Sequence, residues 1–338
     1  MPSFCRHNRL VQNCPICARE QDIELRPVIS PRSARTSQSG RAGASPRPSR
    51  PARSSTQRRP SSPRGGSRTG LTVRRLARGA EDGYRSRLAP GLKSGADAER
   101  LAGELAFAVT RLARLAGDPP GLYAEVADAG AAIEERTWLA FLIAYFGPLD
   151  GERPFAAIEQ VRTSWSSGEQ PDGDGVATGP RTAHDGTRGT RTIEAYRAWA
   201  QRAGSQAAAF TGEPGWTPER RFARVFERLS LPGFDRGARF DLLTTLGRTG
   251  VYELRAGALQ FGGSDPVTLA AKRVFGIGDP LLLERRAQDM AAACELPLEA
   301  FDVGLYNWER GSRATLGMDS GEEPDATTLG ATLAALGL

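Results

Sequence analysis

Apolar residues recur every three or four positions through most of the chain beyond residue 97, the spacing that lines one face of an α-helix. In 97–116, Leu101, Leu105 and Leu112 share a face, Asp97 is a suitable N-cap, and Gly117 follows the last turn. The same spacing predicts further helices at 131–146, from 154 onward, and at 192–204, 217–229, 240–247, 298–309 and 327–336. No alternation of strands and helices, dinucleotide-binding glycine motif or Walker loop accompanies them. We therefore expect an all-α fold.

Residues 265–286 predict two helices joined by a tight turn. Asp265 and Asp279 are good N-caps, and each precedes a proline suited to the first helical position. Gly276 can adopt the left-handed conformation that ends a helix, and Gly278 follows it closely. Exposed backbone amides and a helix N-terminus suit a phosphate, and the basic Lys272 and Arg273 lie just before the turn. An ordinary packing corner between two helices has the same pattern.

Two stretches lack helical spacing. Residues 164–191 form a break whose length is typical of a functional or a disordered loop, and they contain His184. Residues 251–261 contain two short apolar runs around Arg255-Ala256-Gly257, which predict a small β-hairpin.

The positive charge of the chain is concentrated in one segment. The net charge is +6, but residues 31–70 hold ten arginines and no acidic residue, and the remainder has 35 basic and 39 acidic residues. Because this segment is rich in Ser, Arg, Pro and Gly, it cannot bury enough apolar surface to fold, and we expect 21–70 to be a disordered linker. Its arginines would attract nucleic acid, although a solvated linker in an arginine-rich protein has the same composition.

The first twenty residues contain a candidate metal site. Cys5, His7, Cys14 and Cys17 form the pattern C-x-H-x6-C-x2-C, with two close pairs of ligands separated by a short loop. Three thiolates and an imidazole suit tetrahedral Zn²⁺, and a site filled by four protein ligands is structural. We expect a zinc-knuckle-like segment at 1–20; a tail with reactive thiols is the alternative.

Neither a membrane span nor an apolar signal core is present, so we expect a cytoplasmic protein. The predicted organisation is a zinc-knuckle-like segment (1–20), a disordered linker (21–70), an all-α domain (71–310) and a polar C-terminal tail (311–338).

The strongest candidate for catalysis is a carboxylate. Asp302 lies 24 residues after Gly278 in an apolar stretch, with Tyr306 and Trp308 close behind. Such surroundings favour a raised pKa, or a place beside an aromatic base pocket. A helix cap or an ion pair with Arg285 or Arg286 is the structural alternative, and His184 is the one histidine outside the metal pattern.

The helix, Gly-x-Gly turn and helix, followed two dozen residues later by an aspartate, resemble the helix-hairpin-helix DNA glycosylase superfamily. This resemblance implies that Gly276 and Gly278 form a hairpin that binds a DNA phosphate, and that Asp302 is the catalytic acid. The chain departs from the superfamily pattern because Val-Gly follows Asp302, and Asp279 stands where Lys or Arg is common.

Several runs are more closely similar to the α-glutamyl/putrescinyl thymine pyrophosphorylase family, clade 3. They are Glu135–Leu142, Gly179–Thr182, Arg220–Leu229, Arg239–Leu243 and Leu305–Trp308.

This resemblance implies a DNA-binding enzyme that acts on a modified or flipped thymine-type base. The family is proposed to displace pyrophosphate from an activated 5-hydroxymethyluracil base and to attach an amine. Asp302 would stabilise charge or transfer a proton, with Arg181, His184, Tyr306 and Trp308 around the base. A non-catalytic DNA-binding module, or a scaffold that recruits protein partners through the N-terminal segment, would be the alternatives.

Overall fold

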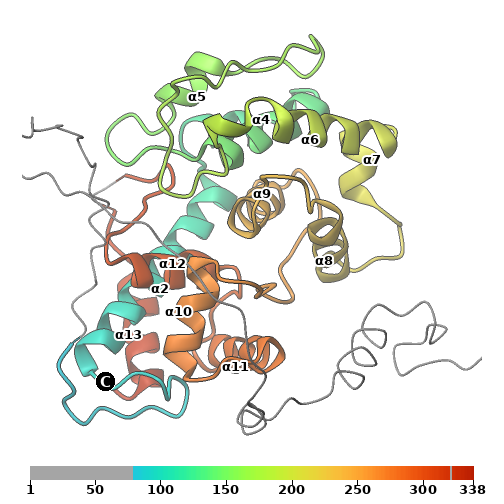
Figure 1. Ribbon diagram of the computed structural model, residues 1–338. Helices are drawn as coiled ribbons and strands as arrows, with labels where there is room; N and C mark the ends of the chain where they lie inside the picture. Colours follow the sequence, from blue (N-terminus) through green and yellow to red (C-terminus); the bar gives the residue numbers. More distant parts are fainter. Residues whose placement is uncertain (1–78, 320–321) are drawn as a thin grey trace, which may run out of the picture. The chain divides into compact units, whose positions relative to one another are not determined.

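The computed structural model describes residues 79–319 and 322–338 (Figure 1). These residues form helices and loops and contain no strand, which confirms the helical class over the part described. The candidate zinc ligands Cys5, His7, Cys14 and Cys17 and the linker 21–70 lie outside the described residues. Within the described ranges, no helix has both the length and the apolarity needed to cross a membrane.

The described helices have the following bounds: α2 (Gly95–Gly117), α3 (Leu122–Ala127), α4 (Ile133–Phe146), α5 (Ala156–Val161), the short 3₁₀ helix η2 (Gly186–Arg188), α6 (Arg191–Arg202), α7 (Gln206–Thr211), α8 (Pro218–Arg228), α9 (Arg236–Arg248), α10 (Pro266–Phe275), α11 (Pro280–Ala293), α12 (Ala300–Arg310) and α13 (Ala326–Leu336).

The helices form two groups that meet along α2. In the C-terminal group, α12 and α13 pack against α2, α10 packs against α12, and α11 packs against α10 (Figure 1). In the central group, α4 packs against α3, α5, α7 and α9, while α6 to α8 continue the layer. Because α2 also contacts α9, a residue between α9 and α12 lies at the junction of the two groups.

The contact between α2 and α12 is close because a glycine lies in it. A Cβ atom on Gly304 would come within 2.8 Å of Leu105 Cδ2 and 3.2 Å of its Cα. One turn later, the Trp308 indole nitrogen donates to the carbonyl of Asp97 at 2.9 Å. These contacts fix the orientation of α12, the helix that carries the candidate residues Asp302, Tyr306 and Trp308.

The long loop between α5 and α6 is anchored to the central group. Glu135 accepts hydrogen bonds from the backbone amides of Trp165 (2.8 Å) and Ser166 (3.0 Å). The Arg197 guanidinium lies 4.5 Å from the Trp138 ring centre and 4.6 Å from that of Trp165, which gives two cation–π contacts. The loop therefore has a defined path that leads to Arg181 and His184.

The prediction of a β-hairpin at 251–261 is wrong. The backbone amides of Leu259 and Phe261 donate to the Glu284 carboxylate at 2.7 and 2.8 Å, and that of Ala256 donates to Glu299 at 3.1 Å. Side-chain carboxylates thus supply the acceptors that a partner strand would have supplied. The apolar residues of the segment are buried against helices.

Residues beyond α12 also contact the helical groups. Ala314, Leu316 and Met318 are buried, and α13 packs against α2. The helix predicted at 327–336 is confirmed by α13, and its N-cap, Asp325, accepts from the Thr328 amide at 2.7 Å. The segment set apart by its sequence as a polar tail thus contributes side chains to the core.

Candidate functional site

Asp302 lies at the junction of the two helical groups, in the first turn of α12, and its side chain is 1% exposed. Its Oδ2 accepts a hydrogen bond from Arg181 Nη2 at 2.5 Å, and its Oδ1 accepts one from Arg236 Nη1 at 2.6 Å. Arg181 comes from the loop before α6, and Arg236 opens α9. Both partners belong to the central group, so these ion pairs connect it to the C-terminal group.

A second aspartate extends the network. Arg181 Nε donates to Asp241 Oδ2 at 2.7 Å, and Asp241 lies on α9. Arg236 also donates to the carbonyl of Leu259, and it lies 3.6 Å from Asp265, the N-cap of α10. We call Arg181, Arg236, Asp241 and Asp302 the buried charge cluster.

The ionisation of Asp302 follows from these contacts. Burial alone would raise its pKa, but the charges and hydrogen bonds of Arg181 and Arg236 hold the pKa below its ordinary value. The sequence-based expectation of a raised pKa is therefore wrong. Asp302 is a carboxylate at neutral pH, and this state suits stabilisation of a positive charge better than donation of a proton.

The buried charge cluster leaves little space for a ligand. The cavity beside it has a volume of about 10 Å³, and Arg181 and Asp241 are among its lining residues. One water molecule needs about that much room. Since both oxygens of Asp302 are already bonded, a substrate reaches this carboxylate only if Arg181 or Arg236 releases it.

The two aromatic candidates on α12 have different surroundings. Tyr306 lies one turn after Asp302 on the same helix face; its hydroxyl donates to the carbonyl of Pro180 at 2.6 Å, and the Arg181 guanidinium lies 4.7 Å from its ring centre. Trp308 lies on another face and contacts α2, where Arg100 lies 5.4 Å from its ring centre. The structure thus brings Tyr306, but not Trp308, to the buried charge cluster.

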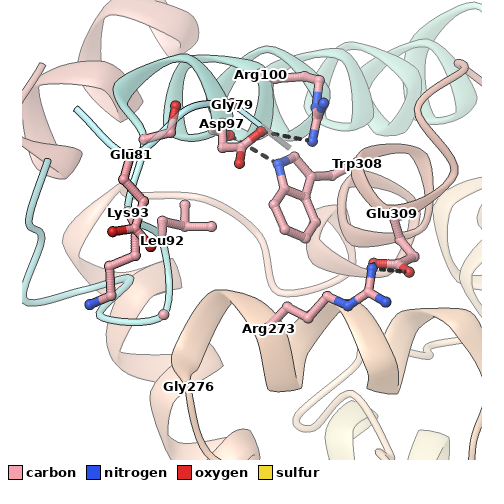
Figure 2. Close-up of a pocket in the computed structure, with 12 residues that line it drawn as sticks. Gly79, Glu81, Leu92, Lys93, Asp97, Arg100, Arg273, Gly276, Trp308 and Glu309 are labelled. Carbon is pink, nitrogen blue, oxygen red and sulfur yellow. Dashed lines mark hydrogen bonds and ion pairs between the residues drawn. The ribbon is translucent and has the colours of Figure 1, made fainter. Parts of the chain in front are cut away.

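Trp308 lines a separate cavity of about 590 Å³ between α2, α10 and α12, which we call the hairpin pocket (Figure 2). Its lining residues are Gly79, Glu81, Gly91, Leu92, Lys93, Ser94, Asp97, Arg100, Arg273, Gly276, Trp308 and Glu309.

Most of the charges at this pocket are paired with each other. Arg273 forms an ion pair with Glu309 at 2.5 Å, and Arg100 lies 3.2 Å from Asp97. Lys93 donates to the carbonyl of Pro90 at 2.9 Å. Figure 2 shows Arg100 and Arg273 with Trp308 at the pocket. The pocket therefore combines an aromatic ring with cationic side chains in a space large enough for a small organic molecule.

The turn between α10 and α11 contains the glycine C-cap that its sequence predicts. Gly276 ends α10 with a φ of 66°, in the left-handed region that favours glycine. The Gly91 amide donates to the carbonyl of Val274 at 2.9 Å, so the segment before α2 packs directly on this turn. Gly276 and Gly278 are exposed, which leaves the turn accessible. The N-terminus of α11 is capped by its own residue Asp279, whose carboxylate accepts from the Leu282 amide at 3.0 Å.

His184 lies away from Asp302. Its Nδ1 is 3.1 Å from the Tyr145 hydroxyl, and its ring packs against Tyr145 and Phe146. It lines a cavity of about 380 Å³ together with Asp185, Arg188 and other residues, and this cavity does not include Arg181 or Asp302. Arg181 and His184 are three residues apart in the chain, yet the Arg181 side chain lies in the buried charge cluster and the His184 ring packs against Tyr145 and Phe146.

No pattern in the sequence indicates Arg236 and Asp241 as neighbours of Asp302 and Arg181. Asp241 falls within the Arg239–Leu243 run, but nothing in that run indicates that its carboxylate is buried beside Arg181. Within the described residues, no group of three or more His, Cys, Asp or Glu side chains could hold a metal ion.

The buried charge cluster and the hairpin turn fall within one segment of the chain. Residues 180–308 match the family model of alpha-glutamyl/putrescinyl thymine pyrophosphorylase clade 3. This result confirms the family resemblance over that segment, which is less than half of the chain. The match begins at Pro180, one residue before Arg181, and ends at Trp308. No curated protein and no solved structure matches the chain.

Proposed function

We propose that this protein is a DNA-modifying enzyme that acts on a thymine-type base. The observation that carries the proposal is the match to the thymine pyrophosphorylase family model over 180–308. That segment contains Arg181, Asp302 and the hairpin turn, which are the candidate groups for chemistry and for backbone contact. The reaction class would be displacement of pyrophosphate from an activated base by an amine.

The hairpin turn and the preceding basic residues would contact the DNA backbone. Gly276 and Gly278 are exposed, Arg273 is half exposed, and Lys272 lies beside it on α10. The Gly276 amide already donates to the carbonyl of Lys272, so the contact would rest on the exposed Gly278 and on the cationic side chains, which suit phosphate oxygens. The hairpin pocket, with Trp308 in its wall, is separate from Asp302, so it would contact a neighbouring part of the DNA and not the reacting base.

Asp302 would stabilise positive charge that develops on the sugar or the base. Its pKa, held below the ordinary value by two arginines, supports a charge-stabilising role over a proton-donating one. Because both of its oxygens are bonded to arginine, this role requires Arg181 or Arg236 to move when substrate binds.

An activity assay tests the reaction. The full-length protein is incubated with a duplex that carries 5-hydroxymethyluracil activated as its pyrophosphate, together with an amine; pyrophosphate release and the digested nucleosides are measured by mass spectrometry. We expect an amine-linked thymine derivative from the wild-type protein. Absence of turnover with each of a panel of amines, from a protein that binds the duplex, would contradict the proposed reaction.

The Asp302→Asn variant tests the role of Asp302, with Asp241→Asn as the matched control. Both aspartates bond Arg181, but only Asp302 also bonds Arg236. We expect turnover to be lost in Asp302→Asn and retained in Asp241→Asn, each shown to be folded by circular dichroism. Equal turnover in both variants would exclude Asp302 from the chemistry.

DNA contact by the hairpin is tested separately by binding a labelled duplex at several salt concentrations. A lost phosphate contact lowers the salt dependence of the binding constant, so Lys272→Ala and Arg273→Ala should each bind more weakly and with a shallower slope. Arg202→Ala, which removes an exposed arginine on α6, is the control. If all three variants bind alike, the hairpin is not the DNA contact.

The buried charge cluster, which has little space beside it, supports a second candidate function: a DNA-binding module without catalytic activity. Both oxygens of Asp302 are occupied, and the adjacent cavity has room for about one water molecule. In this case DNA binding would persist and depend on salt while no base would be altered. A protein-interaction scaffold, in contrast, would show no salt-dependent DNA binding.

We also propose a structural Zn²⁺ bound by Cys5, His7, Cys14 and Cys17. The donor set of three thiolates and one imidazole in two close pairs supports zinc over harder metals. Metal analysis of the purified protein should find one zinc per chain, and Cys14→Ser should lower it. Cys294→Ser is the control, because Cys294 is a free cysteine buried in the helical core. An unchanged zinc content in Cys14→Ser would overturn the site.

A further inference from the structure

Leu281 and Leu282 lie at the N-terminal end of α11 and are largely exposed. Leu281 is 81% exposed and Leu282 is 52% exposed, and both closely follow Gly278 of the hairpin turn. Among the described residues, five large apolar side chains are exposed, and these two are the most exposed of them. A single exposed leucine is ordinary, whereas two adjacent ones at the tip of a hairpin form an apolar patch, which is typical of a contact surface. We call this pair the leucine tip.

An arginine lies one helical turn behind each leucine of the tip. Arg285 and Arg286 each follow one of the leucines by four residues, so each pair shares a face of α11. Both arginines are exposed, and neither forms an ion pair within the described residues. Two carboxylates of this region are exposed: Asp279 is occupied as the N-cap of α11, and Asp289 lies about two turns beyond the leucine tip. The surface therefore presents an apolar tip with cationic side chains directly behind it.

Consecutive contacts connect the start of α11 to the buried charge cluster. Glu284, within one turn of the leucine tip, accepts from two backbone amides of the segment 259–261 at 2.7 and 2.8 Å. Two carbonyls of the same segment accept from Arg236, one of them from its Nε at 3.2 Å. Arg236 in turn donates to Asp302 at 2.6 Å. The leucine tip is thus joined through the core to the candidate carboxylate.

We propose that the leucine tip enters the base stack of DNA next to the base that reacts and separates that base from its neighbour. Duplex DNA fits this surface because apolar side chains can insert between its stacked bases, while its phosphates attract arginine. Arg285 and Arg286 would contact the phosphates beside the opened step. The tip also adjoins the hairpin turn, so a duplex bound there reaches it. This inference rests on the proposed function and names the residues that would unstack the reacting base.

The fluorescence of 2-aminopurine in a duplex tests the insertion, because stacking quenches this base analogue. It is placed beside 5-hydroxymethyluracil in one duplex and about one helical turn away in a second. With saturating full-length protein, we expect the fluorescence of the first duplex to rise about twofold or more and that of the second to change little. No rise in the first duplex when it is fully bound would overturn the proposal.

The double variant Leu281→Ala/Leu282→Ala tests the assignment to these residues. We expect most of the fluorescence rise to disappear at saturation, with little change in Tm because both side chains are exposed. Leu338→Ala is the matched control, since Leu338 is 43% exposed and lies outside the hairpin, and it should keep the rise of the wild type. An undiminished rise in the double variant, or a loss of the rise in Leu338→Ala, would contradict the assignment.

Binding of the same duplexes separates failure of this inference from failure of the proposed function. If the wild-type protein does not bind DNA, both fail. If it binds and the double variant still raises the fluorescence fully, the insertion by these leucines is wrong while the DNA contact stands. Arg285→Ala and Arg286→Ala should each lower the salt dependence of binding and keep the fluorescence rise at saturation. Self-association of the wild type that the double variant loses, without any fluorescence change on DNA, would assign the leucine tip to a second copy of the chain and overturn the proposal.

Discussion

α12 contributes to two regions that differ in the burial of their charged side chains. At its first turn, Asp302 belongs to the buried charge cluster, where two carboxylates and two guanidinium groups bond each other and the adjacent space is about 10 Å³. At its last turn, Trp308 and Glu309 line the hairpin pocket of about 590 Å³, where the ion pairs are partly exposed. One helix of eleven residues thus links a closed, charged junction to an open pocket.

Because of this difference, we expect the ion pairs of the two regions to contribute unequally to the free energy of unfolding. Breaking a buried ion pair leaves an uncompensated charge and is costly, whereas a solvent-exposed pair contributes little. We therefore expect the buried charge cluster to determine how firmly the two helical groups hold together. The hairpin pocket has space for a ligand, and we expect loss of one of its ion pairs to reduce the stability of the protein less.

The largest effect is expected from Asp302→Leu, which leaves the guanidinium groups of Arg181 and Arg236 without this carboxylate. Loss of one partner of a buried ion pair costs about 3–5 kcal/mol. Urea unfolding followed by circular dichroism measures this loss. A loss below about 1 kcal/mol would show that the buried charge cluster does not hold the two helical groups together.

The same carboxylate makes stability depend on pH. Asp302 has a folded-state pKa below its ordinary value of 3.8, because the two arginines outweigh the effect of burial. Its contribution to stability is therefore complete above about pH 4 and is lost as the pH falls through the lower folded-state pKa.

Urea unfolding of the wild type and Asp302→Asn between pH 3 and 6 checks this direction. We expect the difference in unfolding free energy between the two proteins to shrink as the pH falls below about 4, because Asp302 is then protonated in the unfolded wild-type chain while the folded chain still holds it as a carboxylate. A difference that stays constant over the whole range would contradict the ionised state of Asp302.

Gly91→Ala is expected to disturb the hairpin pocket. A Cβ at this position would lie 2.7 Å from the Gly276 amide nitrogen and closer still to the carbonyl oxygen of Arg273, so backbone must shift. Such overpacking costs roughly 1–3 kcal/mol. Gly278→Ala, where no atom lies within 4 Å of the added Cβ, is the control and should cost less. Thermal unfolding of both variants compares them.

The smallest effect on stability is expected from Arg273→Ala. Its ion pair with Glu309 lies at the surface, where the Arg273 side chain is 47% exposed, and such pairs contribute below about 1 kcal/mol. Urea unfolding provides the measurement. A loss as large as that of Asp302→Leu would remove the distinction between the two regions.

Most helices could be predicted because their signals are local. The helix expected at 97–116 is α2, Gly95–Gly117, and the predicted caps Asp265 and Asp279 hydrogen-bond to the first turns of α10 and α11. Of the three six-residue helices among the described residues, α5 was predicted, whereas α3 and α7 were not, because so short a segment shows little apolar periodicity.

The buried charge cluster could not be predicted, because its residues are far apart in the chain. Arg181 is 60 residues from Asp241 and 121 from Asp302, and no local pattern links them. For Asp302, apolar neighbours in the sequence suggested a raised pKa, whereas two distant arginines lower it. The predicted hairpin at 251–261 was wrong for a related reason, since its hydrogen-bond acceptors are the distant carboxylates of Glu284 and Glu299.

The long separations within the cluster also have a kinetic consequence. Contacts between residues far apart in sequence close large loops, and this entropy cost tends to delay their formation during folding. Asp302 joins Arg181 and Arg236 across 121 and 66 residues, so we expect these ion pairs to be absent from the folding transition state. Ion pairs that form after the transition state slow unfolding and leave the folding rate almost unchanged. In a plot of rate constants against denaturant concentration, Asp302→Asn should therefore raise the unfolding arm and leave the folding arm nearly where it is in the wild type.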